Sequence, residues 1–443
     1  MIQDLFAEYF YGKKVTVMGL GILGRGVGDT QFLAENQSEI IVTDTKSQVD
    51  LAPSVKALEP FSGITYHLGG HTLADFENRD FIVKTAGVPL DSEFIAHAKA
   101  HNIPVYMSAA LVSYIVTKAN LNVTIIGVTG TRGKSTVTQL IAHILASAGL
   151  RVFLGGNIRG IANLPLLKAL EEGDCLVLEI DSWQLQGFGD LKISPHISVF
   201  TSFLDDHMNY YHGNVEAYFN DKAHIYRHQR EYDVLIASKQ AVAEITKRDN
   251  VNIIIPEDTF FDMQLIGEHN QVAARLAYEA ALQCGLQEDE IKNAIKTFPA
   301  VEGRLQDLGL LGGEKKIRVF NDNNATTGDA TIAAIDAINE TYNKKPILII
   351  GGTDKGLSLD SLEQTILVGV KKCIFLDGTG TARLNLPKEY LFETIPECLE
   401  KAFEIAHDDD IILFSPAFAS FSKHFNNEYE RNDAFMREVK KYV

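Results

Sequence analysis

Residues 123–136 read VTIIGVTGTRGKST, and this stretch decides the fold of the middle of the chain. It joins an apolar, β-branched run over 123–128 to a glycine-rich segment that ends in GKST. Over 137–145 apolar residues recur on one helical face, and Gly149 is placed to end that helix. The pattern predicts a buried strand, a tight loop and an amphipathic helix.

The glycine-rich segment has the chemistry of a phosphate-binding loop. Its backbone N–H groups would surround phosphates, Lys134 would meet their outer oxygens and the Ser135 hydroxyl would bind Mg²⁺. The strict GxxxxGK[ST] spacing is not met, because Val128 stands five residues before Gly133 and the glycine lies at Gly130 instead. The intact GKST between strand and helix still predicts ATP. The expected ATP-binding residues of the loop are Gly130, Thr131, Arg132, Gly133, Lys134, Ser135 and Thr136.

A second turn of this kind lies near the N-terminus. Residues 19–24 read GLGILG, directly after an apolar run, and Asp44 ends the next expected strand. This spacing suits a pyrophosphate at a helix N-terminus, with the acid reaching a ribose hydroxyl. A tight turn that binds nothing is the alternative. NAD and a UDP group make the same demands, so these residues alone leave that choice open.

Short apolar runs alternate with helix-like stretches along the whole chain, which is typical of strands buried on both faces of a parallel sheet. The sequence therefore predicts an α/β protein. At about 150 residues per domain, its 443 residues correspond to three domains, with expected boundaries at 1–109, 110–300 and 301–443. The ten expected strands are 15–18, 40–42, 81–83, 123–128, 175–180, 197–200, 234–237, 347–350, 373–376 and 411–414.

Composition excludes several classes of protein. Lys and Arg number 41 against 58 Asp and Glu, a net charge of −17 that repels long nucleic acids. The four cysteines are scattered, so neither a disulfide framework nor a zinc site is supported. No apolar run approaches the length that crosses a bilayer. We expect a cytosolic protein that binds small molecules, without nucleic acid or membrane insertion.

Further motifs carry a resemblance to a known family. TGTRGKST, GGN (155–157), LEIDSWQL (178–185), DDHMNYYHG (205–213) and YFNDKAHIY (218–226) resemble the central domain of the Mur ligases, ATP-dependent amide-forming enzymes of peptidoglycan synthesis. Later motifs resemble the D-glutamate-adding branch of that family, and the match runs in order over essentially the whole chain. These motifs are GEHN (267–270), EGR (302–304), NDNNATT (321–327), GGTDKG (351–356) and SPAFAS (415–420).

The resemblance implies three α/β domains and a reaction. An N-terminal Rossmann-like domain would hold UDP-N-acetylmuramoyl-L-alanine, which displaces NAD as the ligand of the GLGILG turn. A central P-loop domain would bind ATP and two Mg²⁺ ions, and a C-terminal Rossmann-like domain would bind D-glutamate. The implied UDP-substrate residues are Gly19, Leu20, Gly21, Ile22, Asp44, Thr45, Gly87, Asn157, Ser182 and Gln184.

Roles for other residues also follow from the resemblance. The implied catalytic set is Lys134, Glu179, His207 and Lys222, with Lys222 carbamylated by CO₂ so that it becomes an anionic oxygen ligand. Ser135, Glu179, His207 and that carbamate would hold the Mg²⁺ ions. Adenine and ribose would meet Asn270, Arg304 and Asp322, and glutamate would meet Thr326, Lys355 and Ser420.

The sequence also departs from the family pattern. Asp181 stands where a serine is usual, Asn324 where a lysine is usual and Asn209 where an aspartate is usual, while Thr85-Ala86-Gly87 replaces Ser-Pro-Gly. A carboxylate at Asp181, near the expected sugar path, is unexpected. Ligation of L-glutamate or another amino acid, a sibling ligase, and a nucleotide-binding homologue without catalysis therefore remain alternatives. We expect a monomer.

Overall fold

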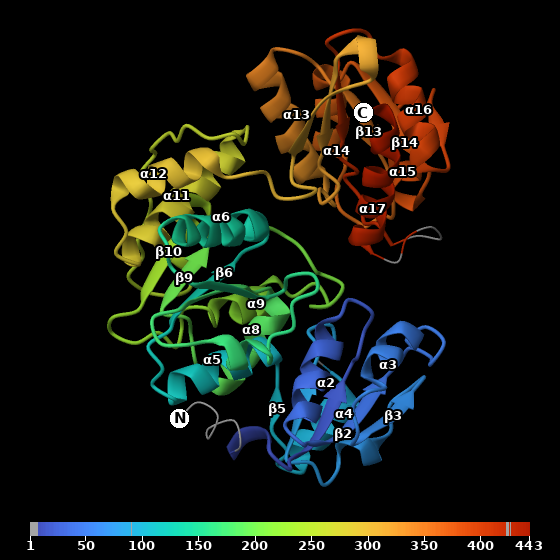
Figure 1. The fold of residues 1–443 in the computed structure, drawn as a ribbon. Helices are drawn as coiled ribbons and strands as arrows, with labels where there is room; N and C mark the ends of the chain where they lie inside the picture. Colours follow the sequence, from blue (N-terminus) through green and yellow to red (C-terminus); the bar gives the residue numbers. More distant parts are fainter. Residues whose placement is uncertain (1–7, 90, 422–424, 426) are drawn as a thin grey trace. The chain divides into compact units, whose positions relative to one another are not determined.

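The computed structural model of the chain describes residues 8–89, 91–421, 425 and 427–443. The chain forms two compact units, Met1–Thr259 with Ala273–Ala294, and Phe260–Val272 with Ile295–Val443. Each is built on parallel β-sheet with helices on the sheet faces, as Figure 1 shows. Among the described residues no helix combines the length and apolar character needed to span a membrane.

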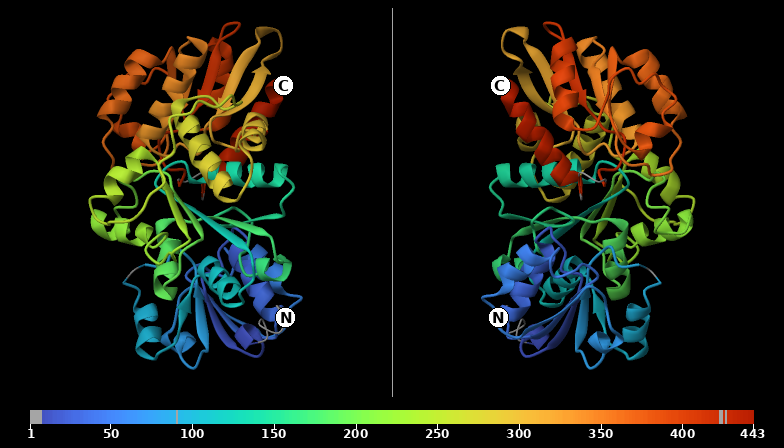
Figure 2. Two further views of the ribbon diagram at one scale, coloured as in Figure 1. Left: turned by 90° about the vertical axis from the view of Figure 1, so that its left-hand side faces the viewer. Right: turned by 90° about the vertical axis from the view of Figure 1, so that its right-hand side faces the viewer.

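The N-terminal part of the first unit is a five-stranded parallel sheet in the order β3-β2-β1-β4-β5 (Figures 1 and 2). The strand order reverses beside β1, which is where α/β sheets place ligands. The GLGILG turn follows β1 directly and leads into α2. The elements are β1 (Lys14–Met18), α2 (Arg25–Glu35), β2 (Glu39–Asp44), α3 (Ala52–Leu58), β3 (Ile64–Leu68), η1 (Leu73–Phe76), β4 (Phe81–Lys84), α4 (Glu93–Ala100) and β5 (Val105–Tyr106).

The first unit contains a second parallel sheet, in the order β10-β9-β6-β8-β7. Its inner strands β8 and β9 are buried along their whole length, as their nearly continuous apolar sequences predict. The strands are β6 (Thr124–Thr129), β7 (Val152–Gly156), β8 (Cys175–Glu179), β9 (Ile197–Phe200) and β10 (Val234–Ala237). The helices are α5 (Ser108–Lys118), α6 (Lys134–Ser147), α7 (Leu166–Ala169), α8 (Ser182–Leu191), α9 (Val215–Ala223) and α10 (Lys239–Ile245), with the greater part of α11 (Glu268–Gln283) and of α12 (Glu288–Thr297).

The second unit has a six-stranded sheet in the order β11-β12-β16-β13-β14-β15, parallel except for the edge pair β11–β12. Successive β13 residues alternate between two cores, since Leu348 packs in one cluster and Ile349 in the other. The strands are β11 (Gln306–Leu311), β12 (Ile317–Asn321), β13 (Ile347–Ile350), β14 (Lys372–Leu376), β15 (Leu391–Phe392) and β16 (Ile411–Phe414). The helices are η2 (Gly313–Lys315), α13 (Gly328–Tyr342), α14 (Asp360–Gly369), α15 (Thr379–Arg383), α16 (Ile395–Ile405), α17 (Glu428–Val439) and η3 (Lys440–Tyr442).

The predicted α/β class is confirmed, and each of the ten predicted strands overlaps an observed one. The helix predicted over 137–145 is part of α6. The sequence analysis did not predict β3, β5, β7, β11, β12 or β15. The domain boundaries at 109 and 300 stay predictions, and residue 109 lies inside α5.

Candidate active site

The loop between β6 and α6 needs glycine at two positions. Gly130 has φ +143°, and a Cβ built on it would lie 2.0 Å from the Thr201 hydroxyl. Gly133 has φ +84° and precedes the first residue of α6. Side chains strongly disfavour such backbone conformations. The glycine at 130, which broke the strict spacing, is therefore required by the close approach of the segment after β9.

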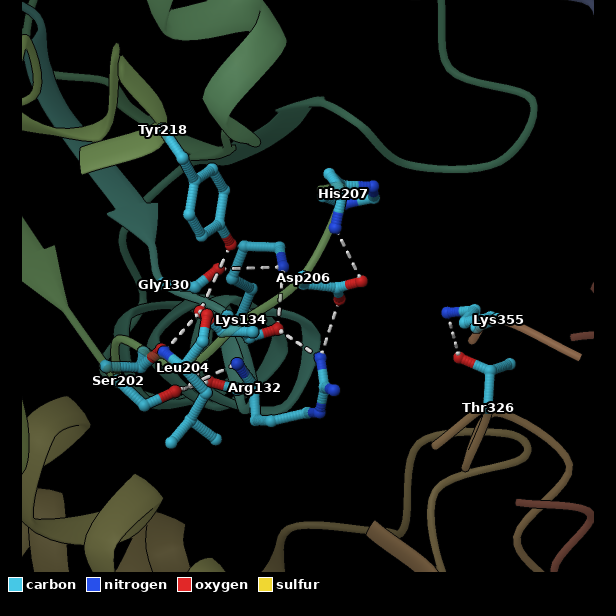
Figure 3. Close-up of polar contacts among 12 residues, drawn as sticks. Gly130, Arg132, Lys134, Ser202, Leu204, Asp206, His207, Tyr218, Thr326 and Lys355 are labelled. Atoms are coloured by element: carbon cyan, nitrogen blue, oxygen red, sulfur yellow. Dashed lines mark hydrogen bonds and ion pairs between the residues drawn. The ribbon is translucent and has the colours of Figure 1, made fainter. Parts of the chain in front are cut away.

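That segment fixes the loop through several hydrogen bonds (Figure 3). The Thr131 amide donates to the Ser202 carbonyl at 2.7 Å, and the Arg132 amide donates to the Ser202 hydroxyl at 2.9 Å. The Thr131 hydroxyl lies 3.1 Å from the Tyr218 hydroxyl. Arg132 also forms a 2.8 Å ion pair with Asp206. The loop is thus held in place before any ligand arrives.

Two lysines converge on one carbonyl of this loop. The Lys134 ammonium donates to the Gly130 carbonyl at 3.0 Å and to the Thr131 carbonyl at 3.3 Å. The Lys222 side chain, from α9, donates to the same Gly130 carbonyl at 2.8 Å. Lys222 is only 1% exposed. Burial, together with the neighbouring Lys134 charge, lowers the pKa of Lys222 well below its ordinary value.

Two further predicted metal ligands belong to elements that flank the loop. Glu179 ends β8 in register with Val128 of β6, two residues before Gly130, and it is buried. The His207 ring lies 4.7 Å from the Trp183 ring, between centroids, and burial lowers the His207 pKa. A neutral imidazole keeps a lone pair that can bind a metal. The Glu179 carboxylate and the Ser135 hydroxyl are the oxygen donors that Mg²⁺ prefers, and the His207 imidazole would add a nitrogen donor beside them.

Asp181, whose carboxylate was unexpected near the sugar path, has a structural role. It is the N-cap of α8, and its carboxylate accepts the Gln184 amide hydrogen at 2.8 Å. The Gln184 side-chain oxygen in turn accepts from the Asp181 amide at 3.4 Å, which completes a capping box. Aspartate and serine cap helices about equally well. The local reason for a residue of this type at 181 is helix capping, and Gln184 takes part in it.

In the N-terminal turn, Asp44 binds the protein's own backbone. One of its carboxylate oxygens accepts from the amides of Leu20 and Gly21, at 2.8 and 3.0 Å, and the other accepts from the Lys46 amide at 2.9 Å. Asp44 therefore ties the end of β2 to the GLGILG turn. This bonding was not expected from the sequence, which assigned Asp44 only to a ribose hydroxyl.

The turn and the central sheet are linked through α2. Arg25, the first residue of α2, donates to the Asn157 side chain at 2.5 Å. Asp29, one turn further along, accepts from the Leu164 amide at 2.8 Å, and burial raises the pKa of Asp29 to about 6. The structure thus brings Asn157 to the beginning of α2, while Ser182 is buried at the first position of α8.

A polar network beside Lys222 was missed by the sequence analysis. Lys84, at the end of β4, donates to the Gln186 side chain at 3.3 Å, and Gln186 donates to Asp221 at 2.8 Å. The Tyr211 hydroxyl also donates to Asp221, at 2.9 Å. Burial raises the Asp221 pKa and lowers the Lys84 pKa. A lysine ending an otherwise apolar buried strand is the signal that could have revealed it.

In the second unit, the three residues expected around adenine and ribose lie in different settings. The Asp322 carboxylate accepts from the Leu305 amide at 3.0 Å and the Ser415 hydroxyl at 2.8 Å, and burial raises its pKa to about 7. Arg304 precedes Leu305 in sequence and therefore lies beside this bond. Asn270, buried in α11, donates to the Ile266 carbonyl at 2.7 Å.

The residues expected to bind glutamate follow strands of the six-stranded sheet of the second unit. Lys355 donates to the Thr326 hydroxyl at 3.1 Å. Ser420 is buried and follows Ala419, which forms an antiparallel bridge with Thr353, two residues before Lys355. The structure therefore brings this predicted group together.

Asn324 is held by uncharged neighbours. Its side-chain oxygen accepts from the Asn323 side chain at 3.0 Å, and its nitrogen donates to the Glu302 carbonyl at 3.2 Å. Asn323 also binds the buried Arg431, whose Nε donates to the Asn323 side-chain oxygen at 2.9 Å. The cation expected at 324 is absent, and Arg431, although close in the network, is engaged with Asn323 and with the Phe418 carbonyl.

A glycine-rich loop between a central parallel strand and a helix, ending in lysine and serine, is the architecture of P-loop nucleotide-binding proteins. Comparison with known proteins identifies the family of P-loop proteins to which the chain is similar. Residues 13–107 match the N-terminal domain of MurD-like Mur ligases, and residues 128–257 match the Mur ligase middle domain.

Relatives of similar length match almost the entire chain. A UDP-N-acetylmuramoylalanine–D-glutamate ligase of Roseiflexus sp. (strain RS-1) is 32% identical, over 98% of this chain and 99% of that protein. The enzyme of the same name from Streptococcus pyogenes serotype M4 is also 32% identical, over 96% of both chains. The chain belongs to the Mur ligase family.

Solved structures share the fold at low sequence identity. The UDP-N-acetylmuramate–alanine ligase MurC of Thermotoga maritima matches with a TM-score of 0.62 and 17% identity, over 97% of this chain and 99% of that one. The MurF ligase of the same organism, solved in complex with ADP, matches with a TM-score of 0.61 and 13% identity, over 91% and 94%. These likenesses support the three-sheet α/β fold.

Proposed function

We propose that the protein is an ATP-dependent ligase that joins D-glutamate to UDP-N-acetylmuramoyl-L-alanine, with release of ADP and phosphate. The observation that carries this proposal is the convergence of Lys134 and Lys222 on the Gly130 carbonyl, at 3.0 and 2.8 Å. Holding phosphate requires only the loop lysine. The second lysine, Lys222, is buried and has a lowered pKa. Its presence is explained if it becomes a carbamate, an anionic metal ligand beside the phosphates.

The choice of substrates is supported by the relatives that match nearly the whole chain and bear that enzyme name. The UDP part would bind at the GLGILG turn with Asp44, Thr45 and Gly87. The muramoyl-alanine part would extend past Asn157, Ser182 and Gln184. The 2.5 Å bond between Arg25 and Asn157 supports this path, because it ties the start of α2 to the loop after β7.

Carbamylation of Lys222 follows from its burial. Only a neutral amine attacks CO₂, giving a carbamate anion and one released proton. A lowered pKa gives the Lys222 amine a larger neutral fraction than an exposed lysine has at the same pH. The carbamate oxygens would join Glu179, His207 and the Ser135 hydroxyl as ligands for two Mg²⁺ ions, which supply charge neutralisation at the phosphates. The nearby Lys134 charge would stabilise the carbamate.

The reaction requires two anions to meet. The terminal carboxylate of the nucleotide substrate attacks the γ-phosphorus of ATP, the bond to the β-phosphate oxygen breaks, and ADP leaves. Lys134 and the amides of 130–136 hold the phosphates in line and offset their charge. The glutamate amine then attacks the acyl-phosphate carbonyl, loses a proton, and the tetrahedral intermediate expels phosphate. Holding the reactants in this geometry supplies most of the rate enhancement.

The second unit would supply the remaining substrate contacts. Lys355, Thr326 and Ser420 would hold the glutamate carboxylates, supported by the 3.1 Å bond between Lys355 and Thr326. Asn270, Arg304 and Asp322 would meet adenine and ribose. A monomeric state and a cytoplasmic location are part of this proposal, since all the substrates are small and water-soluble.

The test is phosphate release by purified protein with ATP, Mg²⁺, UDP-N-acetylmuramoyl-L-alanine and D-glutamate, with each component omitted in turn. Release that requires both the nucleotide substrate and D-glutamate is expected. Release with L-glutamate instead would keep the mechanism and change the product. No release in any combination, from protein that still binds ATP, would favour a homologue without catalysis and overturn the proposal.

A further inference from the structure

Three side chains of types that bind metal ions lie close together beside the N-terminal sheet, and none of them is assigned to the reaction. Glu77 follows η1, His97 lies in the last turn of α4, and His101 is the C-cap of the same helix. Residues four apart on a helix share one face. The helix therefore presents both imidazoles together, and the segment after η1 brings the carboxylate to them.

The geometry of the three side chains suits one ion. A Glu77 carboxylate oxygen lies 3.0 Å from His97 Nε2, and the ring centroids of His97 and His101 are 4.3 Å apart. One ligand atom from each residue falls within 4.8 Å of the others. Zinc–nitrogen bonds of about 2.0–2.1 Å place tetrahedral ligands roughly 3.3 Å apart. The separations therefore need to shorten only modestly for the three atoms to bind one ion.

A hydrogen bond to the backbone determines which tautomer of His101 is present. Its Nδ1 lies 2.9 Å from the His97 carbonyl oxygen. A carbonyl oxygen can only accept, so Nδ1 carries the hydrogen and the neutral ring has its lone pair on Nε2. This is the backbone hydrogen bond that commonly orients the second nitrogen of a metal-binding histidine. His97 faces the carboxylate through Nε2, and one nitrogen of each ring lies within 4.8 Å of the other ligand atoms.

We propose that Glu77, His97 and His101 form a binding site for a divalent transition-metal ion, with Zn²⁺ as the best fit. Two imidazole nitrogens and one carboxylate oxygen match zinc, whereas Mg²⁺ prefers oxygen ligands in octahedral geometry. Three protein ligands leave a fourth position for water. The net charge of −17 attracts cations to the molecule.

The elements that the ion would join are already packed together. Phe76 of η1 and Ile95 and Ala98 of α4 belong to one hydrophobic cluster with Ile82 of β4. The ligands are therefore carried by a formed scaffold, and little chain entropy is lost on binding. A bound ion would clamp η1 to the C-terminal end of α4 and stabilise the N-terminal sheet.

The test uses full-length protein stripped of metal and titrated with Zn²⁺ in millimolar Mg²⁺, with Co²⁺ absorption as a second probe of the ligand set. His101→Ala and Glu77→Gln are expected to weaken binding at this site about tenfold or more. Lys99→Ala, an exposed change on the same helix, is expected to leave it unaltered. His212→Ala removes an exposed histidine elsewhere and serves as a second control.

Both ligand variants alter exposed or half-exposed side chains, so their unfolding temperatures without Zn²⁺ should equal that of the wild type. Added Zn²⁺ should then raise the unfolding temperature of the wild type more than that of either variant. Equal Zn²⁺ affinity and equal Co²⁺ spectra in the wild type, His101→Ala and Glu77→Gln would overturn the proposal. None of these measurements depends on ligase activity, so the result is independent of the proposed function.

Discussion

The side chain of Lys222 donates a 2.8 Å hydrogen bond to the Gly130 carbonyl, which also accepts from Lys134 at 3.0 Å. An α9 side chain is thereby fixed on the phosphate loop of a different βα unit. Burial of Lys222, and next the repulsion between the two ammonium groups that share this carbonyl, lower the Lys222 pKa well below its ordinary value. A lowered pKa favours the neutral amine, which is the form that the proposed reaction with CO₂ needs.

Lys222→Ala is expected to lose most ligase activity, because the anionic ligand formed from the lysine disappears. A short-chain carboxylate added to the assay should restore part of the activity by occupying the vacated volume. Lys247→Ala, which removes an exposed lysine that pairs with Glu244, is the matched control. It should keep the wild-type ligase activity, and added carboxylate should not raise that activity. Phosphate release with and without acetate measures both effects. Unchanged activity in Lys222→Ala would rule out a carbamate role.

Asp181→Ala should destabilise the protein by about 1 kcal/mol, the usual cost of removing a helix N-cap. Asp181→Ser should keep most of that stability, since a serine hydroxyl also accepts the Gln184 amide hydrogen. Urea unfolding of the three proteins measures the difference. If serine destabilises as much as alanine does, the charge of Asp181, and not its capping bond, is what the structure needs.

Much of the fold could be predicted because most strands are buried along their length. The edge strand β3 escaped prediction because none of its residues is fully buried and two of its five side chains are exposed. Arg318 likewise interrupts the apolar run of β12. The elements that face solvent on one side thus carry a weaker sequence signal than the buried ones.

Some features of the candidate site could likewise be predicted from the sequence, and others could not. The GKST loop could be predicted because its chemistry lies within a few consecutive residues. The pairing of Arg132 with Asp206, 74 positions along the chain, could not, since it depends on the sheet bringing β6 and β9 together. The same holds for Lys84, which ends β4, and Gln186, which lies in α8, 102 positions further along the chain. The cap role of Asp181 depends on where α8 begins, and the sequence alone does not mark that residue.

Lys355→Met is expected to raise the KM for glutamate about 10- to 100-fold, the range for losing a hydrogen bond to a charged group. The KM values for ATP and for the nucleotide substrate should change little. Lys371→Met, in the same unit and paired with Asp410, is the control. Steady-state kinetics with each substrate varied in turn will separate the effects. An equal rise in all three KM values would instead indicate a general structural role for Lys355.

Asp322 predicts a pH-dependent stability. Its folded-state pKa of about 7 exceeds the ordinary value of 3.8, because the carboxyl is buried. The folded protein therefore binds the proton more tightly than the unfolded chain does. The resulting stability is fully present below the ordinary pKa and is lost as pH rises through about 7. A shift of this size corresponds to at most about 4 kcal/mol.

Asp322→Asn removes the titrating group but keeps a side-chain oxygen for the Leu305 amide. The variant should therefore gain stability relative to the wild type as pH rises from about 5 to about 8. Thermal unfolding of both proteins across that range measures the difference. A difference that stays constant with pH would mean that the carboxyl does not titrate there. The Leu305 and Ser415 hydrogen bonds would then hold it ionised, ready to accept from a ribose hydroxyl at neutral pH.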